Sequence, residues 1–138
     1  MFKKCLVLLI CGVCIMGCWG INNKPIFFDY ASEYTVYLQN SSNFSKVKKA
    51  NNLQYFLTFN KSGESCFVNQ EQFNALELAN SFNAKLVFTE ELEQGINYYF
   101  YSKEIKYSQK LNGHKVNMQV FVASDYAVLG CPIIYGGY

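Results

Sequence analysis

Apolar residues occur first in one continuous run and then in short alternating runs. The segment from Leu6 to Met16 is apolar almost throughout. Residues 33–39 instead alternate, with Tyr34, Val36 and Leu38 in phase. A period of two is typical of a strand with one buried face. The chain therefore combines an apolar N-terminal segment with a region rich in predicted strands.

Strand-like runs continue to the end of the chain. Runs at 54–59 and 64–68 flank Lys61–Gly63 and predict a hairpin, after a polar loop at 40–43. Asn112–Gly113 is a strong signal for a second hairpin, because both residues tolerate positive φ. Further strands are predicted at 85–89, 96–102, 107–111, 114–123 and 126–134, and Pro132 is expected to place the end of the last strand at a sheet edge.

One segment has the spacing of an amphipathic helix. Asn69 and Gln72 form a capping-box pattern at its start. The apolar residues that follow recur at helical spacing: Ala75, Leu78, Ala79 and Phe82. We expect a helix over 70–82, with Leu78 and Phe82 buried. The predicted fold class is α+β, a single antiparallel β-sheet with one long α-helix packed on it.

The N-terminal segment has the layout of an export signal. Lys3 and Lys4 precede the apolar run, which ends at Gly17–Cys18. The residues Ile15–Cys18 resemble a bacterial lipobox, which implies that Cys18 carries the lipid. We therefore expect an export signal at 1–17, a tether at 18–25 and one domain at 26–138. Cleavage near Gly20, giving a secreted protein, and an uncleaved anchor are the alternatives.

Composition indicates a folded domain that does not bind nucleic acid. The chain is 51% hydrophobic and 17% aromatic, which is unlike a disordered protein. All twelve basic residues are lysine. Two of them lie in the leader, so the other ten balance the ten acidic residues. A neutral domain without arginine lacks the basic face that nucleic-acid binding requires.

The C-terminal half resembles the YwmB-like family. The shared motifs occur in this order: Phe88–Glu91, Tyr101–Ser102, Gly113, Val116–Gln119 and Gly130–Gly136. The family comprises small exported proteins of low-GC Gram-positive bacteria with a TATA-box-binding-protein-like fold. The resemblance covers residues 66–138. It implies a curved antiparallel sheet with a helix and an extracytoplasmic location, and it brings no catalytic residues.

Three groups of residues could carry chemistry. Cys66 and Cys131 are interpreted as a disulfide, as two buried thiols or as a catalytic thiol. His114, the single histidine, follows the predicted Asn–Gly turn and is expected to be exposed. Tyr99 and Tyr101 are expected to pack in the core or against cross-strand neighbours, and an exposed binding surface formed by the pair is the alternative. Glu90, Glu91 and Glu93 are expected on an acidic loop, without the oxygen ligands of a calcium site.

These features favour a binding role over catalysis. No catalytic, metal-binding or cofactor-binding residues are predicted. The expected function is a non-enzymatic accessory or binding domain, lipid-anchored on the outer face of a bacterial membrane, with a protein or glycan partner. The alternatives are a small secreted enzyme with Cys66 or Cys131 as nucleophile and a structural envelope protein without a ligand.

Overall fold

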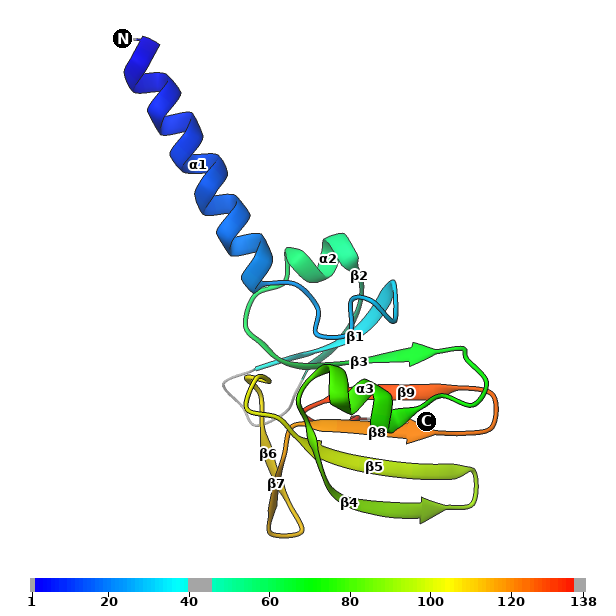
Figure 1. Cartoon of the computed structure of the whole chain (residues 1–138). Coiled ribbons are helices and arrows are strands. Elements are labelled where there is room, and N and C mark those ends of the chain that lie inside the picture. The colour runs from blue at the N-terminus through cyan, green and yellow to red at the C-terminus, as the bar shows by residue number, and fades with distance from the viewer. Residues whose placement is uncertain (1, 40–45, 136–138) are drawn as a thin grey trace.

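The computed structural model describes residues 2–39 and 46–135. Two features predicted from the sequence, the polar loop at 40–43 and Gly136 of the C-terminal motif, lie outside the described residues. The described chain forms a long N-terminal helix followed by a mixed α and β region (Figure 1).

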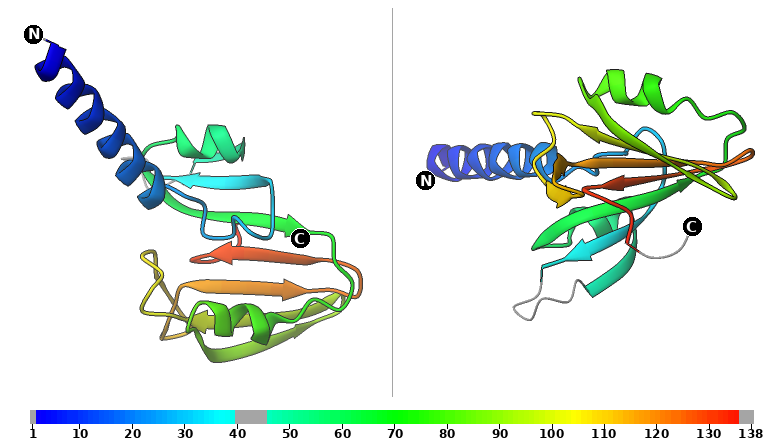
Figure 2. Two further views of the ribbon diagram at one scale, coloured as in Figure 1. Left: turned by 45° about the horizontal axis from the view of Figure 1, so that its top comes forward. Right: turned by 90° about the horizontal axis from the view of Figure 1, so that it is seen from below.

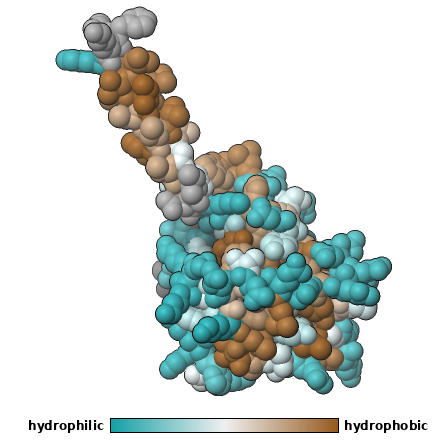
Figure 3. All heavy atoms as spheres, viewed as in Figure 1, coloured by the Kyte–Doolittle hydropathy of each residue, from teal (hydrophilic) through white to brown (hydrophobic). Residues whose placement is uncertain are grey.

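Helix α1, Phe2–Asn22, extends away from the rest of the molecule (Figure 1). Large apolar side chains between Leu6 and Met16 have exposed fractions of 53–72%. They form a projecting hydrophobic rod in Figure 3. The helix includes most of the predicted leader, 1–17, and part of the predicted tether, 18–25. Among the described residues, no helix combines the length and the apolar character needed to cross a membrane.

The main sheet has seven antiparallel strands in the order β2-β1-β3-β9-β8-β5-β4. Its strands are β1 Glu33–Leu38, β2 Lys46–Asn51, β3 Lys61–Val68, β4 Lys85–Leu92, β5 Gly95–Tyr101, β8 Met118–Val122 and β9 Ala127–Cys131. Strands β6, Gln109–Leu111, and β7, His114–Val116, form a separate two-stranded sheet. The predicted α+β class with an antiparallel sheet is confirmed. Strand β2 was missed, because its lysine-rich sequence has no apolar alternation.

The helix predicted over 70–82 is shorter and begins later. Helix α3 spans Ala75–Ser81, and the side chain of Asn74 caps it by accepting hydrogen bonds from Leu76 N and Glu77 N, both at 3.1 Å. The predicted start is wrong, because Gln72 has a φ of 51° and cannot continue a helix from Asn69. Leu78 is buried as expected. Phe82 is only partly buried, because it occupies the C-cap.

The strand predicted over 54–59 is wrong, because a short helix replaces its first half. Helix α2, Asn52–Phe56, follows a capping box formed by Asn51 and Gln54. Gln54 N donates to Asn51 Oδ1 at 2.9 Å, and Asn51 N donates to Gln54 Oε1 at 3.1 Å. These reciprocal bonds satisfy backbone donors at the start of the helix. This local signal outweighs the aromatic content that favoured a strand.

The hairpin predicted around Lys61–Gly63 is also wrong. These residues belong to the continuous strand β3, which pairs with β1 and β9. Gly63 allows the backbone of β9 to approach β3 closely, and it does not form a turn. A Cβ atom there would lie 2.2 Å from the Cys131 carbonyl oxygen. The glycine therefore indicates tight packing against the end of β9.

The last strand is central, which contradicts the edge position expected from Pro132. Strand β9 lies between β3 and β8 and ends at Cys131. The proline follows the strand after a cis peptide bond, so it removes no hydrogen bond from the sheet. A Cβ atom at Gly130 would lie 2.8 Å from Ile134 N. Glycine there lets the C-terminal segment pass directly over the sheet.

The Asn112–Gly113 hairpin is confirmed, with φ values of 50° and 81°. The strand predicted over 114–123 is instead divided between β7 and β8 at Asn117. The side chain of Asn117 accepts a hydrogen bond from Ser102 N at 2.8 Å and donates to Ser102 O at 2.6 Å. It thereby holds the end of β5. The predicted acidic loop is shorter than expected, because Glu90 and Glu91 belong to β4.

One face of the main sheet carries the hydrophobic core. Its buried strand residues are Tyr34, Val36, Ala50, Cys66, Val68, Phe100, Met118, Val120, Ala127, Leu129 and Cys131. Helix α3 covers one part of this face (Figure 2). The connecting segment, residues 23–32 between α1 and β1, covers another part through Phe27. The Phe27 ring packs edge-on against Phe82 at 6.1 Å.

The position of the helix cap can be tested with two asparagines. We expect Asn74→Ala to lower the free energy of unfolding by about 1 kcal/mol, because it removes the side-chain cap of α3. Asn69→Ala should change it by less than about 0.5 kcal/mol, because Asn69 is an exposed residue outside the helix. Urea denaturation of residues 19–138 measures both. Equal losses would contradict the observed cap.

Candidate functional site

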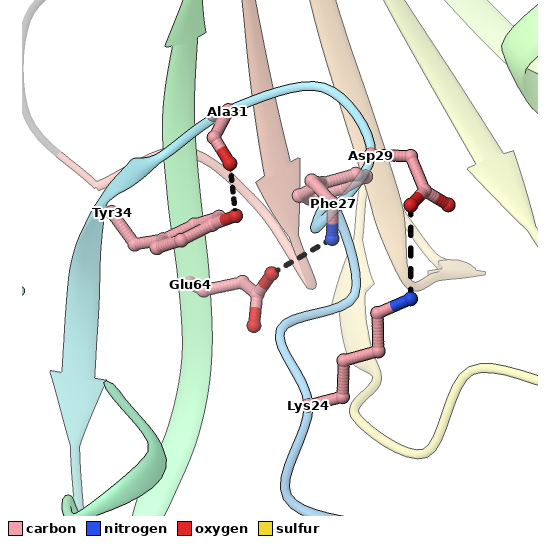
Figure 4. A network of polar contacts seen from close by, with 6 residues as sticks. All are labelled: Lys24, Phe27, Asp29, Ala31, Tyr34 and Glu64. Atoms are coloured by element: carbon pink, nitrogen blue, oxygen red, sulfur yellow. Dashed lines mark hydrogen bonds and ion pairs between the residues drawn. The ribbon is translucent and has the colours of Figure 1, made fainter. Parts of the chain in front are cut away.

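A buried cluster of polar residues on the core face of the sheet centres on Glu64. This strand residue is 0% exposed and lies on the core face of β3. Tyr55 of α2 donates its hydroxyl hydrogen to Glu64 Oε2. The backbone N–H of Phe27 donates to Oε1 at 3.1 Å (Figure 4). One carboxylate thus joins the sheet, α2 and the connecting segment.

The connecting segment folds over this carboxylate as a tight loop. Tyr30 N and Ala31 N donate to Phe27 O at 3.0 and 3.3 Å. The Tyr34 hydroxyl group donates to Ala31 O (Figure 4). Lys24 and Asp29 form an exposed ion pair at 3.7 Å, which adds little stability in water. The backbone contacts therefore hold Phe27 over Glu64.

Lys61 connects the end of α1 to α2 beside the same site. Its Nζ atom donates to Thr58 O at 2.7 Å and to Tyr55 O at 3.2 Å. It also donates to Asn23 Oδ1, and it lies 4.4 Å from the centre of the Tyr55 ring. Asn23 in turn donates to Phe56 O. These bonds fix the position at which α1 leaves the domain.

Burial determines the ionisation of this cluster. Removal from water raises the pKa of the Glu64 carboxyl group, although the hydrogen bonds from Tyr55 and Phe27 partly oppose the shift. Burial also raises the pKa of the Tyr55 hydroxyl group, and the nearby Glu64 carboxyl adds to the rise. The pKa of the Lys61 ammonium group is lowered by burial. Burial thus favours the uncharged forms of the Glu64, Tyr55 and Lys61 side chains.

The two candidate cysteines lie next to Glu64 and are free, buried thiols. Cys131 is opposite Glu64 in the pairing of β3 and β9, whereas Cys66 is opposite Leu129. The cysteines are therefore diagonal neighbours, a geometry that separates residues by about 7–8 Å, at the limit for a disulfide. Burial raises the pKa of both thiols, and Glu64 adds to the rise. This disfavours the thiolate that a nucleophile requires.

The remaining candidate residues are separated from the cysteines. Tyr99 is 6% exposed and stacks on Phe88 at 4.4 Å, which agrees with core packing and not with a binding surface at this residue. Tyr101 is half-buried, with Lys115 Nζ at 5.2 Å from its ring. His114 begins β7 and its ring lies 5.9 Å from that of Phe88 on β4. His114 therefore lies beside β4, and it is not positioned next to β3 or β9 as a base for a cysteine nucleophile.

A second buried polar network lies on the opposite face of the sheet. Gln119 Nε2 donates to Asn97 Oδ1 at 2.9 Å, and Gln119 Oε1 accepts from Ile134 N at 2.9 Å. Tyr135 N donates to the Tyr37 hydroxyl oxygen at 3.0 Å. These bonds hold the segment after β9 across the sheet. The motif residues around 119 and 130–135 therefore serve packing in this structure.

Sequence reasoning missed Glu64, Tyr55 and Lys61. A signal was present, because Glu64 alternates in phase with Cys66 and Val68 in a predicted strand. An acidic residue in phase with buried positions needs a hydrogen-bonding partner in the core. The partner Tyr55 could not be identified, since its segment was predicted to be a strand.

The buried carboxyl group predicts a specific pH dependence. Its raised folded-state pKa means that its contribution to stability is full below the unfolded value of 4.5 and is lost as the pH rises through the folded-state pKa. The loss should be about 1.4 kcal/mol for each unit by which the pKa is raised. We expect Glu64→Gln to remove this pH dependence, and Glu33→Gln, at an exposed site on β1, to retain it. Urea unfolding of residues 19–138 across the pH range measures the difference, and a Glu64→Gln curve parallel to wild type would contradict it.

The thiols provide a second test. We expect Cys66 and Cys131 to resist alkylation by N-ethylmaleimide at neutral pH until residues 19–138 are denatured, because both are buried with raised pKa values. Ser124→Cys supplies an exposed reference thiol that should react at once. Peptide mass spectrometry identifies the labelled positions. Rapid alkylation of Cys66 or Cys131 in the folded protein would support a reactive cysteine instead.

Comparison with known proteins found no matching family model, no matching curated protein and no matching solved structure. In the described part of the chain, no group of three or more histidine, cysteine, aspartate or glutamate side chains could hold a metal ion. The functional argument therefore depends on the geometry of this chain. Its main features are the exposed apolar helix α1 and the buried polar cluster around Glu64, beside which Lys61 and Asn23 join α1 to the domain.

Proposed function

We propose that this chain is a membrane-anchored, extracytoplasmic bacterial protein with a non-enzymatic accessory or binding domain. The anchor is a lipid on Cys18, after removal of residues 1–17 as an export signal. The observation that carries the proposal is the exposed apolar surface of α1, which projects from the folded domain (Figure 3).

The uncovered apolar helix supports insertion into a membrane during export. Its side chains from Leu6 to Met16 are mainly leucine, isoleucine, valine and methionine, and Lys3 and Lys4 precede them. Covering each large side chain with an apolar medium is favourable by about 1.5–3 kcal/mol. The domain covers little of this segment, so a bilayer or the export machinery is the natural environment.

The interior of the domain supports binding rather than catalysis. Glu64, the buried carboxylate, is bonded to Tyr55 and Phe27 and has no exposed surface for a substrate. The thiols of Cys66 and Cys131 are buried and their pKa values are raised. A protein or glycan partner would therefore meet the outer surface, where half-buried Tyr101 is the more accessible member of the predicted aromatic pair.

We also propose that the chain belongs to the YwmB-like group. Support comes from the packing of its motif residues against one another. Asn117 bonds Ser102, and Gln119 bonds Ile134 next to Gly130. These contacts join motifs that are separate in the sequence and pack them against one another.

The anchor predicts the location of a variant protein. We expect Cys18→Ala to release the exported domain from membranes or to leave it uncleaved, because lipid attachment requires the thiol of Cys18. Cell fractionation of the full chain expressed in a bacterial host, with mass spectrometry of the N-terminus, measures this outcome. Cys14→Ala, in the part of the chain that is removed, is the matched control. An unmodified N-terminus near Ile21 would contradict the lipid anchor.

A further inference from the structure

An apolar surface continues from the end of α1 onto the domain. We call it the α2 patch: Trp19, Phe28, Leu53, Phe56, Leu57 and Phe59. Leu53, Leu57 and Phe59 have exposed fractions of 68%, 58% and 67%, and Phe28 has 40%. Exposed aliphatic and aromatic side chains gathered in this way indicate a surface that contacts another apolar medium.

Ring contacts hold the patch against the end of α1. The Trp19 ring lies 4.4 Å from that of Phe56 and 5.6 Å from that of Phe59, between centroids. A Cβ atom at Gly20 would lie 3.0 Å from the Phe56 ring, so α1 and α2 are in close contact. A hollow of about 430 Å³ between Gly20, Phe28 and Phe56 extends the apolar surface.

The position of the patch identifies what covers it. Helix α2 lies at the end of the domain from which α1 emerges (Figures 1 and 2). Trp19 directly follows Cys18, so a lipid on Cys18 places the Trp19 ring at the membrane surface. The contacts of Trp19 with Phe56 and Phe59 then bring α2 to the same level. Aromatic side chains are favoured there, at the boundary between headgroups and acyl chains.

Charge around the patch matches an anionic bilayer. Between Glu33 and Glu64 the sequence contains four lysines and no acidic residue. Two of them, Lys48 and Lys49, are exposed on β2, which leads directly into α2. Lys24, which is paired with Asp29, lies 4.3 Å from the centre of the Phe28 ring and adds no net charge to the patch. Lysines beside a shallow apolar surface are attracted to negatively charged headgroups.

We propose that the α2 patch is a second membrane contact, inserted into the headgroup region of an anionic lipid bilayer. This inference rests on the proposed lipid anchor at Cys18. The lipid keeps the protein on the membrane, and the patch fixes the orientation of the domain. The face that carries α2 lies on the bilayer, and the far end of the sheet points away from it.

The single tryptophan allows a direct test. In the full chain, expressed with its leader and reconstituted into phosphatidylcholine–phosphatidylglycerol vesicles, Trp19→Phe removes the native fluorophore and conserves its ring contacts. Leu57→Trp then places a reporter in the patch, and Leu76→Trp on α3 is the matched control. The two leucines have similar exposed fractions, 58% and 52%. Acyl-chain-brominated lipid in the vesicles quenches only those tryptophans that enter the bilayer.

We expect brominated lipid to quench the Leu57→Trp reporter at least about twofold, because an interfacial helix buries its apolar face about 5–10 Å deep. The Leu76→Trp reporter should remain unquenched. Equal quenching of the two reporters, or none at Leu57→Trp, overturns the second contact. Protection of an unquenched Leu57→Trp from aqueous acrylamide would indicate a protein partner on the patch instead.

Flotation of the same vesicles separates this inference from the anchor. A chain that floats with the vesicles after a carbonate wash but shows equal quenching retains the lipid anchor and loses only the second contact. A chain that does not float overturns both.

Discussion

The hydrogen-bonded carboxylate of Glu64 connects three parts of the chain that have no strand pairing with one another. It receives one bond from the connecting segment through Phe27 and one from α2 through Tyr55. A carboxylate without these partners would be costly in an apolar core. The burial of β3 therefore depends on contacts with the connecting segment and α2. This requirement links the orientation of α1 to the packing of the sheet.

The same requirement relates the fold to the proposed function. Lys61 and Asn23 lie beside Glu64 and fix the end of α1 against α2. The apolar surface of α2 is thereby directed to the side from which α1 leaves. A buried polar cluster in the core thus affects the surface, because it determines which face of the domain lies next to α1 and the proposed anchor. Its contacts hold the fold together, and burial raises the pKa of both neighbouring thiols.

Sequence reasoning predicted features that depend on neighbouring residues. Local patterns predicted three features correctly: the alternation in β1, the strand at 64–68 that forms part of β3, and the turn at Asn112–Gly113. The errors arose where distant contacts determine the conformation. Gly63 was read as a turn residue, although its lack of a side chain accommodates the Cys131 carbonyl group. Helix α2 was not predicted, because the aromatic residues after Asn52 favoured a strand, and the capping box of Asn51 and Gln54 is evident only in the structure. The buried cluster could not be assembled, because Tyr55 and Phe27 reach Glu64 only through the tertiary fold.

The route by which the proposed anchor joins the sheet has a mechanical consequence. Tension applied at Cys18 passes through Asn23 and the connecting segment before it reaches β1. On that route it meets the bonds from Lys61 and Glu64, which both belong to β3. Strand β3 is an interior strand, paired with β1 on one side and β9 on the other. A pull on the proposed membrane attachment would thus be shared with an interior strand of the sheet.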